Sequence, residues 1–328
     1  MIWRRPGLEL SAFPLDAAIF DVDGVLIDTS QSYIRAVMSA SEHLVRVVNG
    51  LRAAPSPLVS PEDILLFKLA GGWNNDWHCT ALFTALWTAR LREWRGTPAA
   101  EILLAEWARR AQLAASVHQG GMPWLHGIAP ASAIPDPEVA RWAHDEYYWG
   151  AALVRELYGH EPVYATDAPG YVHNERLLLD AATVRALIER GITRYGLITG
   201  RWGPEVIWAA RVIAEAWREE QGALRHESAH GTTPFGAIIP SEEYVKPDPA
   251  ALVAALERLR SHGALYVGDT ADDLDLVLRY RREVERPLPT LAVCVAEGDT
   301  AAIFQARGAD ITISSVTELP DALAERLL

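Results

Sequence analysis

Two aspartates stand two residues apart in the stretch FDVDGVLIDT, residues 20–29, and a glycine follows them directly. Residues two apart in an extended segment point the same way, so Asp21 and Asp23 are expected on one side of the chain. Two like charges about 4 Å apart repel by roughly 4 kcal/mol at an effective dielectric constant near 20. A pair kept at that cost indicates a bound cation or a proton transfer. The alternative is a solvated strand end followed by a turn.

The elements that position this pair follow from hydrophobic periodicity. Residues 15–22 predict a buried strand, and from about residue 180 short apolar runs alternate with helical segments, which predicts a parallel sheet. Between these parts the apolar spacing is helical, with Gly/Pro-rich breaks, the longest at 119–137. The sequence thus predicts an α/β fold. Its parts are a core with a Rossmann-like parallel sheet, residues 1–29 and 181–328, and an inserted, mostly α-helical domain, residues 30–180.

Other polar residues are expected at the same edge of the sheet, because ligands of open α/β sheets bind at the carboxyl ends of the strands. Thr199 and Gly200 end one predicted strand, Asp269 ends another, and Lys246 stands before a predicted helix. Each has an ordinary explanation alone, as a turn, a surface lysine or an acid in the first turn of a helix. Together with the aspartate pair they form a cation site, a nucleophile and donors for phosphate oxygens, which favours phosphoryl transfer.

The order of these motifs resembles a known family. D-x-D-G-x-L-x-D, then T-G, K-P-x-P and G-D-T-x-x-D resemble the haloacid dehalogenase (HAD) superfamily of phosphotransferases, over residues 15–29 and about 181–295. The insertion directly after the first motif resembles the helical cap of the subgroup related to phosphoglycolate phosphatase. The inserted segment is much longer than the usual small four-helix cap of that subgroup, and the stretch 119–137 is the expected elaboration.

The resemblance implies a mechanism. Asp21 would attack phosphorus and form an aspartyl phosphate, and an ionised carboxylate needs no base for this. Asp23 would protonate the leaving oxygen and then deprotonate the hydrolytic water, helped by crowding among carboxylates. The implied catalytic residues are Asp21, Asp23, Thr199 and Lys246, and the implied phosphate-binding residues are Asp21, Gly24, Thr199, Gly200 and Lys246.

A Mg²⁺ ion is implied as cofactor, because the implied ligands are all oxygen atoms. Those ligands are Asp21, the backbone carbonyl of Asp23, Asp269 and Asp273. Asp272 is the alternative to Asp273, which the family's spacing of four residues after Asp269 favours.

The acid at position 23 distinguishes reaction classes. Dehalogenases and phosphonatases of the superfamily lack it, so Asp23 indicates phosphate-ester chemistry. The expected function is a Mg²⁺-dependent phosphatase acting on a small phosphorylated metabolite. A phosphomutase, or a non-catalytic small-molecule-binding protein of the same fold, is the alternative.

A zinc peptidase is a further alternative, because HESAH, residues 226–230, matches H-E-x-x-H. That motif needs a helix to stack both histidines, and here glycines stand on both sides. A polar loop is the expected structure.

One segment of the inserted domain, LAGGWNNDWHC at residues 69–79, combines amides with indoles. The glycines could end one helix and an Asn or Asp could cap the next. The segment also stands where capped HAD enzymes carry a substrate-specificity loop, and G-G-x-N-N-D-W resembles a signature of one HAD phosphatase subfamily. The predicted specificity residues are Trp73, Asn74, Asn75, Asp76 and Trp77.

Composition limits the partners. The net charge of −13 argues against a nucleic-acid partner, since that affinity depends on Lys and Arg. Two cysteines without a paired pattern fit a reducing cytosol, and neither a signal peptide nor a membrane span is expected. A cytoplasmic location is therefore predicted. The sequence is silent on oligomeric state.

Overall fold

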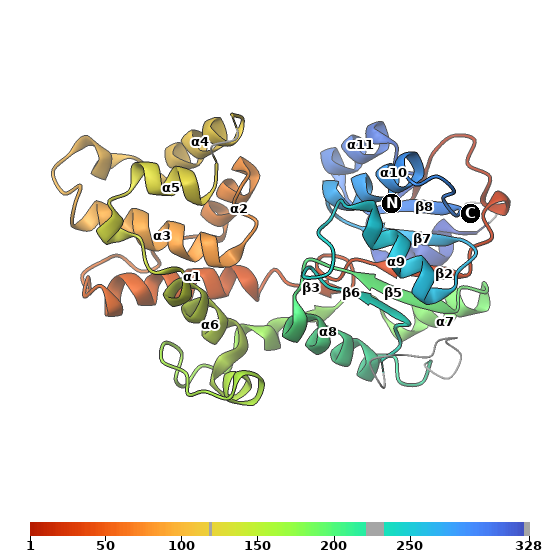
Figure 1. The fold of residues 1–328 in the computed structure, drawn as a ribbon, viewed down its shortest axis with the longest axis horizontal. Coiled ribbons are helices and arrows are strands. Elements are labelled where there is room, and N and C mark those ends of the chain that lie inside the picture. The colour runs from red at the N-terminus through yellow and green to blue at the C-terminus, as the bar shows by residue number, and fades with distance from the viewer. Residues whose placement is uncertain (118–119, 221–232, 325–328) are drawn as a thin grey trace. The chain divides into compact units, whose positions relative to one another are not determined.

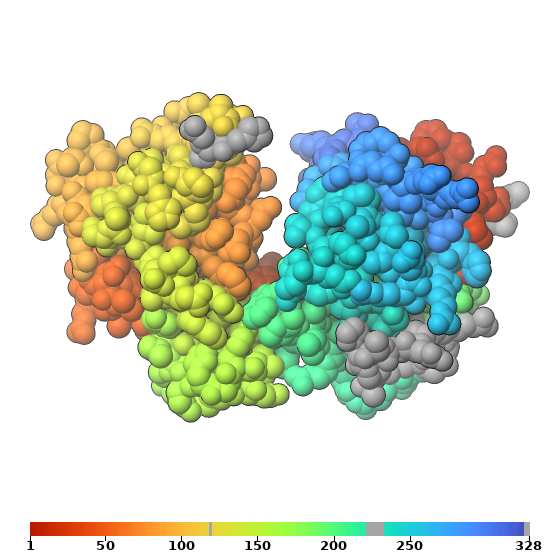
Figure 2. Space-filling model, viewed as in Figure 1, coloured from red at the N-terminus to blue at the C-terminus, as the bar shows by residue number. Residues whose placement is uncertain are grey.

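A computed structural model describes residues 1–117, 120–220 and 233–324 (Figures 1 and 2). The HESAH motif lies outside these residues. The chain divides into two compact units. We call residues 1–28 and 176–328 the sheet unit and residues 29–175 the helical unit.

The sheet unit is built on one twisted sheet. In the described residues it has seven strands in the order β1-β9-β8-β7-β2-β5-β6, all parallel except β1, which is antiparallel to β9. The strands are β1 (Trp3–Arg4), β2 (Ala17–Phe20), β5 (Arg194–Ile198), β6 (Ala237–Ile239), β7 (Ala264–Gly268), β8 (Thr290–Val295) and β9 (Ile311–Ile313).

Helices cover both faces of this sheet (Figure 1). Alternate residues of β2 show the layering, because Phe20 packs in one apolar cluster and Ile19 in the other. A strand buried on both faces is apolar throughout, as β2 is. On the face of Phe20 lie α7 (Ala181–Glu189), α8 (Gly203–Ala216) and α12 (Leu319–Ala322), and on the other lie α9 (Pro249–Leu259), α10 (Ala271–Glu283) and α11 (Gly298–Arg307).

The helical unit has its own core, centred on aromatic residues such as Phe67, Phe83 and Trp107. Its helices are α1 (Tyr33–His43), continued by a π-helical turn (Leu44–Val48), α2 (Pro61–Ala70), α3 (Asp76–Leu91), α4 (Leu104–Ala115), α5 (Met122–Ile128) and α6 (Pro137–Tyr158). The predicted α/β fold with an inserted helical domain is confirmed.

Two details of the helical unit differ from the expectation. Helix α5 lies inside the stretch 119–137, which was predicted as a break. A helix can form there although the stretch contains Pro123, because Pro123 stands in the first turn, where a proline costs no hydrogen bond. Helix α6 breaks at Gly150, whose φ is +77°. A Cβ at Gly150 would lie 2.4 Å from the backbone carbon of Pro169, so the two chain segments touch there.

The chain leaves and re-enters the sheet unit through a short antiparallel ribbon. Strand β3 (Ile27–Asp28) pairs with β4 (Arg176–Leu177), with Asp28 opposite Arg176. The amide of Leu178 also donates to the carbonyl of Leu26 at 2.8 Å. Residues 176–180, expected in the inserted domain, therefore belong to the sheet unit. No helix among the described residues is both long and apolar enough to cross a bilayer.

Candidate active site

Asp21 directly follows β2, the strand that pairs with both β5 and β7. Its backbone amide continues the ladder by donating to the carbonyl of Val267 at 2.9 Å, so the position of the side chain is fixed by the sheet. One carboxylate oxygen, Oδ1, accepts the amide of Val22 at 2.8 Å. The other, Oδ2, lies 2.8 Å from Nζ of Lys246, and Asp21 is 5% exposed.

Lys246 bridges two buried carboxylates, because its Nζ also lies 2.7 Å from Oδ1 of Asp273. The hydroxyl of Tyr266 donates to the same Oδ1 at 2.7 Å. Oδ2 of Asp273 accepts the Thr270 hydroxyl at 2.6 Å, part of the capping box that starts α10. Asp273 is thus held at the sheet edge, whereas Asp272 is exposed on the first turn of the helix.

Asp269 and Gly24 lie against each other beside this pair. A Cβ on Gly24, whose φ is +73°, would lie 2.1 Å from Oδ2 of Asp269. The other oxygen of Asp269, Oδ1, is buried without a hydrogen-bond partner among the described residues. One carboxylate oxygen from each of Asp21, Asp269 and Asp273 lies within 4.8 Å of the others. A buried oxygen cluster with an unpartnered atom fits a Mg²⁺ ion.

The charges in this cluster are not balanced by Lys246 alone. Burial raises the pKa of Asp21 well above its usual value, and Asp273 adds to the shift while Lys246 opposes it. Burial and the nearby Asp273 raise the pKa of Asp269 to about 7. Burial would raise the pKa of Asp273, but the charge of Lys246 and the hydrogen bonds from Lys246, Thr270 and Tyr266 together outweigh burial and lower that pKa. A cation bound at this cluster would compete with protons for the carboxylate oxygens.

Thr199 and Gly200 follow β5, as predicted. The Thr199 amide donates to the carbonyl of Ile239 at 3.1 Å, and the Thr199 hydroxyl accepts the amide of Arg201 at 3.1 Å. Thr199 is buried and Gly200 is exposed. The structure therefore brings Asp21, Thr199, Lys246, Asp269 and Asp273 to the carboxyl ends of their strands or to the loops beside them.

Two residues of this site were missed by the sequence analysis. The first is Tyr266, a β7 residue whose hydroxyl supports Asp273. The second is Arg201, which is 1% exposed and places Nε and Nη2 at 2.9 and 2.8 Å from Oδ1 of Asp23. Its signal in the sequence was an arginine directly after T-G.

The predicted specificity segment is mostly occupied by structural contacts. Trp73 is fully buried and packs edge-to-face on Phe67 and Trp124, and its role as a substrate contact stays a prediction. The Asn75 side chain caps α3 by accepting the amide of His78 at 3.1 Å.

The two residues that follow Asn75 are also engaged inside the helical unit. Asp76 pairs with Lys68 at 2.9 Å, and the Trp77 indole donates to the buried Asp145 at 2.7 Å. Of the five predicted residues, Asn74 alone is exposed and makes no hydrogen bond or ion pair to the described residues. The role of the segment in specificity stays a prediction.

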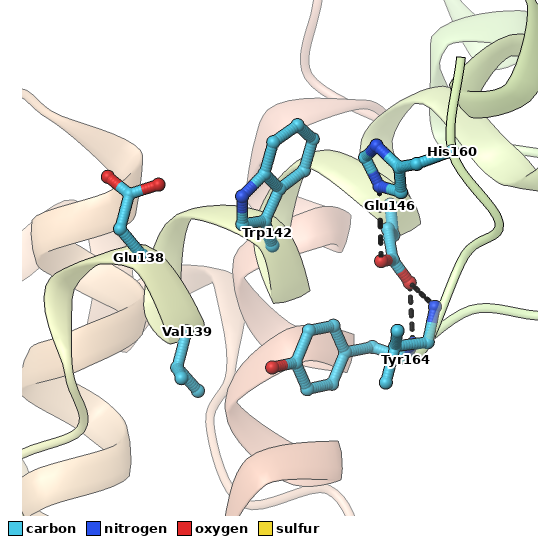
Figure 3. Close-up of a pocket in the computed structure, with 7 residues that line it drawn as sticks. Glu138, Val139, Trp142, Glu146, His160 and Tyr164 are labelled. Atoms are coloured by element: carbon cyan, nitrogen blue, oxygen red, sulfur yellow. Dashed lines mark hydrogen bonds and ion pairs between the residues drawn. The ribbon is translucent and has the colours of Figure 1, made fainter. Parts of the chain in front are cut away.

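The helical unit also has a cavity of about 320 Å³ (Figure 3). Four apolar or aromatic side chains and three titratable ones line it: Val139, Trp142, Val163 and Tyr164, with Glu138, Glu146 and His160. The buried Glu146 fixes one wall, because its Oε2 accepts the amides of Val163 and Ala165 at 2.8 and 3.1 Å, and that of Tyr164. None of the predicted specificity residues lines this cavity.

Comparison with known proteins identifies the family. The model of the haloacid dehalogenase-like hydrolases matches residues 15–276. The chain therefore belongs to the haloacid dehalogenase-like hydrolases, and the prediction of an enzyme of this superfamily is confirmed.

Similar structures and a curated relative add to this. Phosphatase Tt82 from Thermococcus thioreducens is 23% identical, with a TM-score of 0.52 over 83% of this chain and 90% of that one. A structural-genomics target is 15% identical, with a TM-score of 0.56 over 94% and 98%. At these identities the two structures show a shared fold.

A curated protein, imidazoleglycerol-phosphate dehydratase from Phytophthora nicotianae, is 38% identical over 69 residues. The match spans 21% of this chain and 13% of that protein.

Proposed function

We propose that the chain is a Mg²⁺-dependent phosphatase that hydrolyses a small phosphorylated metabolite through an aspartyl phosphate on Asp21. The observation that carries this proposal is the buried set at the end of β2. There Oδ2 of Asp21 lies 2.8 Å from Nζ of Lys246, and Asp21 shares a carboxylate cluster with Asp269. A second acid, Asp23, follows Asp21 by two residues. A nucleophile, an acid, a fixed cation and a metal site are the parts that phosphoryl transfer needs.

The residues divide the chemistry into two steps. An oxygen of Asp21 attacks phosphorus, the ester P–O bond breaks, and Asp23 gives a proton to the leaving oxygen. Asp23 then takes a proton from a water whose oxygen attacks the phosphorus, and the bond between Asp21 and phosphorus breaks to release phosphate. Lys246, the Thr199 hydroxyl and the Gly200 amide would stabilise charge on the phosphate oxygens.

Asp21, Asp269 and the backbone carbonyl of Asp23 would hold the Mg²⁺ ion. Asp273 would support it from behind, because its two oxygens already accept bonds from Lys246, Tyr266 and Thr270. Mg²⁺ bound there would reduce the repulsion between the attacking carboxylate and the phosphate.

The substrate is proposed at the level of its class. An assay of released phosphate over a panel of phosphorylated metabolites, with Mg²⁺, tests it. Imidazoleglycerol phosphate belongs in the panel because of the partial match to the curated relative. Release of inorganic phosphate distinguishes a phosphatase from a phosphomutase, which would return the phosphoryl group to a sugar.

The role of Asp21 has its own test. Asp21→Asn should abolish Mg²⁺-dependent hydrolysis of an aryl phosphate, since an amide is a far poorer nucleophile. Rapid acid quench of the wild type with a ³²P-labelled ester should trap label on the protein, and the variant should trap none. Activity within tenfold of wild type in Asp21→Asn would exclude Asp21 as the nucleophile.

A further inference from the structure

The backbone of Arg201, the arginine that follows the T-G motif, is held by two hydrogen bonds. Its backbone amide donates to the Thr199 hydroxyl at 3.1 Å, and its carbonyl accepts the amide of Ser241 at 3.1 Å. The loop of Arg201 is therefore attached to residues following two neighbouring strands, β5 and β6. Its side chain is 1% exposed, so the guanidinium has little freedom to move away from the site.

The Arg201 guanidinium binds one carboxylate oxygen of Asp23, Oδ1, and makes no contact of this kind with the other, Oδ2. Nε and Nη2 of Arg201 lie 2.9 and 2.8 Å from Oδ1 of Asp23. No hydrogen bond to Oδ2 of Asp23 is present among the described residues, and the Asp23 side chain is 34% exposed. Two charge-assisted bonds to one oxygen fix the rotation of the carboxylate and leave Oδ2 available to a reacting group.

We propose that Arg201 is the positioning residue of the acid–base carboxylate: it binds Oδ1 of Asp23, so that Oδ2 carries the proton to the leaving oxygen. The proposal rests on the phosphatase function proposed above. A general acid contributes about 10² to 10⁴ in rate, and displacing a reacting group by about 1 Å costs on the order of 10²-fold. Loss of Arg201 should therefore weaken proton donation while leaving the nucleophile Asp21 in place.

The leaving group provides the test. Phenolate from phenyl phosphate needs a proton as it departs, whereas 2,4-dinitrophenolate does not. In Arg201→Gln, the pre-steady-state burst of phenol should slow about 30-fold and the burst of dinitrophenolate less than threefold, with little change in KM. Arg201→Lys should recover part of the phenol burst, because an ammonium restores one of the two bonds.

A double-mutant cycle separates positioning from phosphate binding. In the Asp23→Asn background, Arg201→Gln should change the phenol burst less than threefold, because the acid that Arg201 positions has already been removed. In metal-free protein, the loss of Tm in the double variant should be smaller than the sum of the two single losses. The control is Arg194→Gln, which removes an arginine at the opposite end of β5, 2.5 Å from Asp16, and should change neither burst.

Equal slowing of both bursts in Arg201→Gln, or a further tenfold loss in the Asp23→Asn background, would overturn the proposal. Either result would mean that Arg201 binds the phosphate itself or maintains the fold. A wild type that hydrolyses no phosphate ester with Mg²⁺ would refute the proposed function instead. That result differs from an active wild type whose Arg201 variants show no leaving-group effect.

Discussion

Replacing Lys246 by methionine keeps most of the side-chain volume and removes the cation between Asp21 and Asp273. In the metal-free protein the two carboxylates would then face each other without a counter-charge. Breaking a buried ion pair by removing one partner costs about 3–5 kcal/mol. The Lys246 side chain is 12% exposed, so the lower end, about 3 kcal/mol at pH 8, is expected.

The loss of stability in Lys246→Met should become smaller as the pH falls. Burial and Asp273 raise the pKa of Asp21 while Lys246 opposes them, so removing Lys246 raises this pKa further. As the pH falls, Asp21 takes up a proton and the repulsion disappears. At pH 5 the destabilisation should therefore shrink to about 1 kcal/mol, the value of an ordinary lost hydrogen bond.

Urea unfolding with EDTA at both pH values, fitted with a separate transition for each unit, measures this. Lys68→Met is the matched control: Lys68 pairs with Asp76 at 2.9 Å in the helical unit, and its loss should cost under about 1 kcal/mol at either pH. With Mg²⁺, kcat of Lys246→Met for an aryl phosphate should fall about 10²- to 10³-fold. A loss of stability that is equal at pH 5 and pH 8 would refute the reasoning.

Two further predictions concern the metal and the helical unit. Folding raises the pKa of Asp269 from 3.8 to about 7, so this group makes metal-free protein less stable as the pH rises from about 4 through about 7. Since Mg²⁺ must displace that proton, added Mg²⁺ should raise Tm more at pH 8 than at pH 6; an equal rise at both would contradict the metal site. In the helical unit, Asn74→Ala should lower kcat/KM about tenfold for the preferred metabolite, about 1.4 kcal/mol, and less than threefold for phenyl phosphate. Asn75→Ser is the companion variant, because serine keeps a cap on α3. Equal losses of kcat/KM on both substrates in Asn74→Ala would show that the segment does not select the substrate.

The sheet edge was predictable because its residues are tied to strand ends. Asp21, Thr199 and Asp269 each follow an apolar run, and the parallel topology that periodicity predicts brings such positions together. The choice between Asp272 and Asp273 also had a local signal. Thr270 three residues before Asp273 makes a capping box, which turns that side chain back toward the strand end.

The contacts that depend on side-chain direction were not predictable in the same way. Arg201 looked like any charged residue of a loop, and only the packing of β5 and β6 buries it against Asp23. Trp73 shows the same limit: an indole between glycines and amides suggested a ligand contact, and the sequence did not show that it packs against Trp124 of α5, a helix inside a Gly/Pro-rich stretch. Local composition describes a turn well but does not show what packs over it.

The ribbon of β3 and β4 has a consequence for how such chains can change over time. Asp28 and Arg176 are paired neighbours, so the excursion of the chain through residues 29–175 begins and ends at one spot on the sheet unit. The entropic cost of closing a loop rises only slowly with loop length. Replacing residues 29–175 by a longer or shorter segment that folds by itself would therefore change the stability of the sheet unit very little. A genetic exchange at these two residues would graft a different module onto an unaltered sheet unit. The two units are thereby separable units of inheritance in this fold.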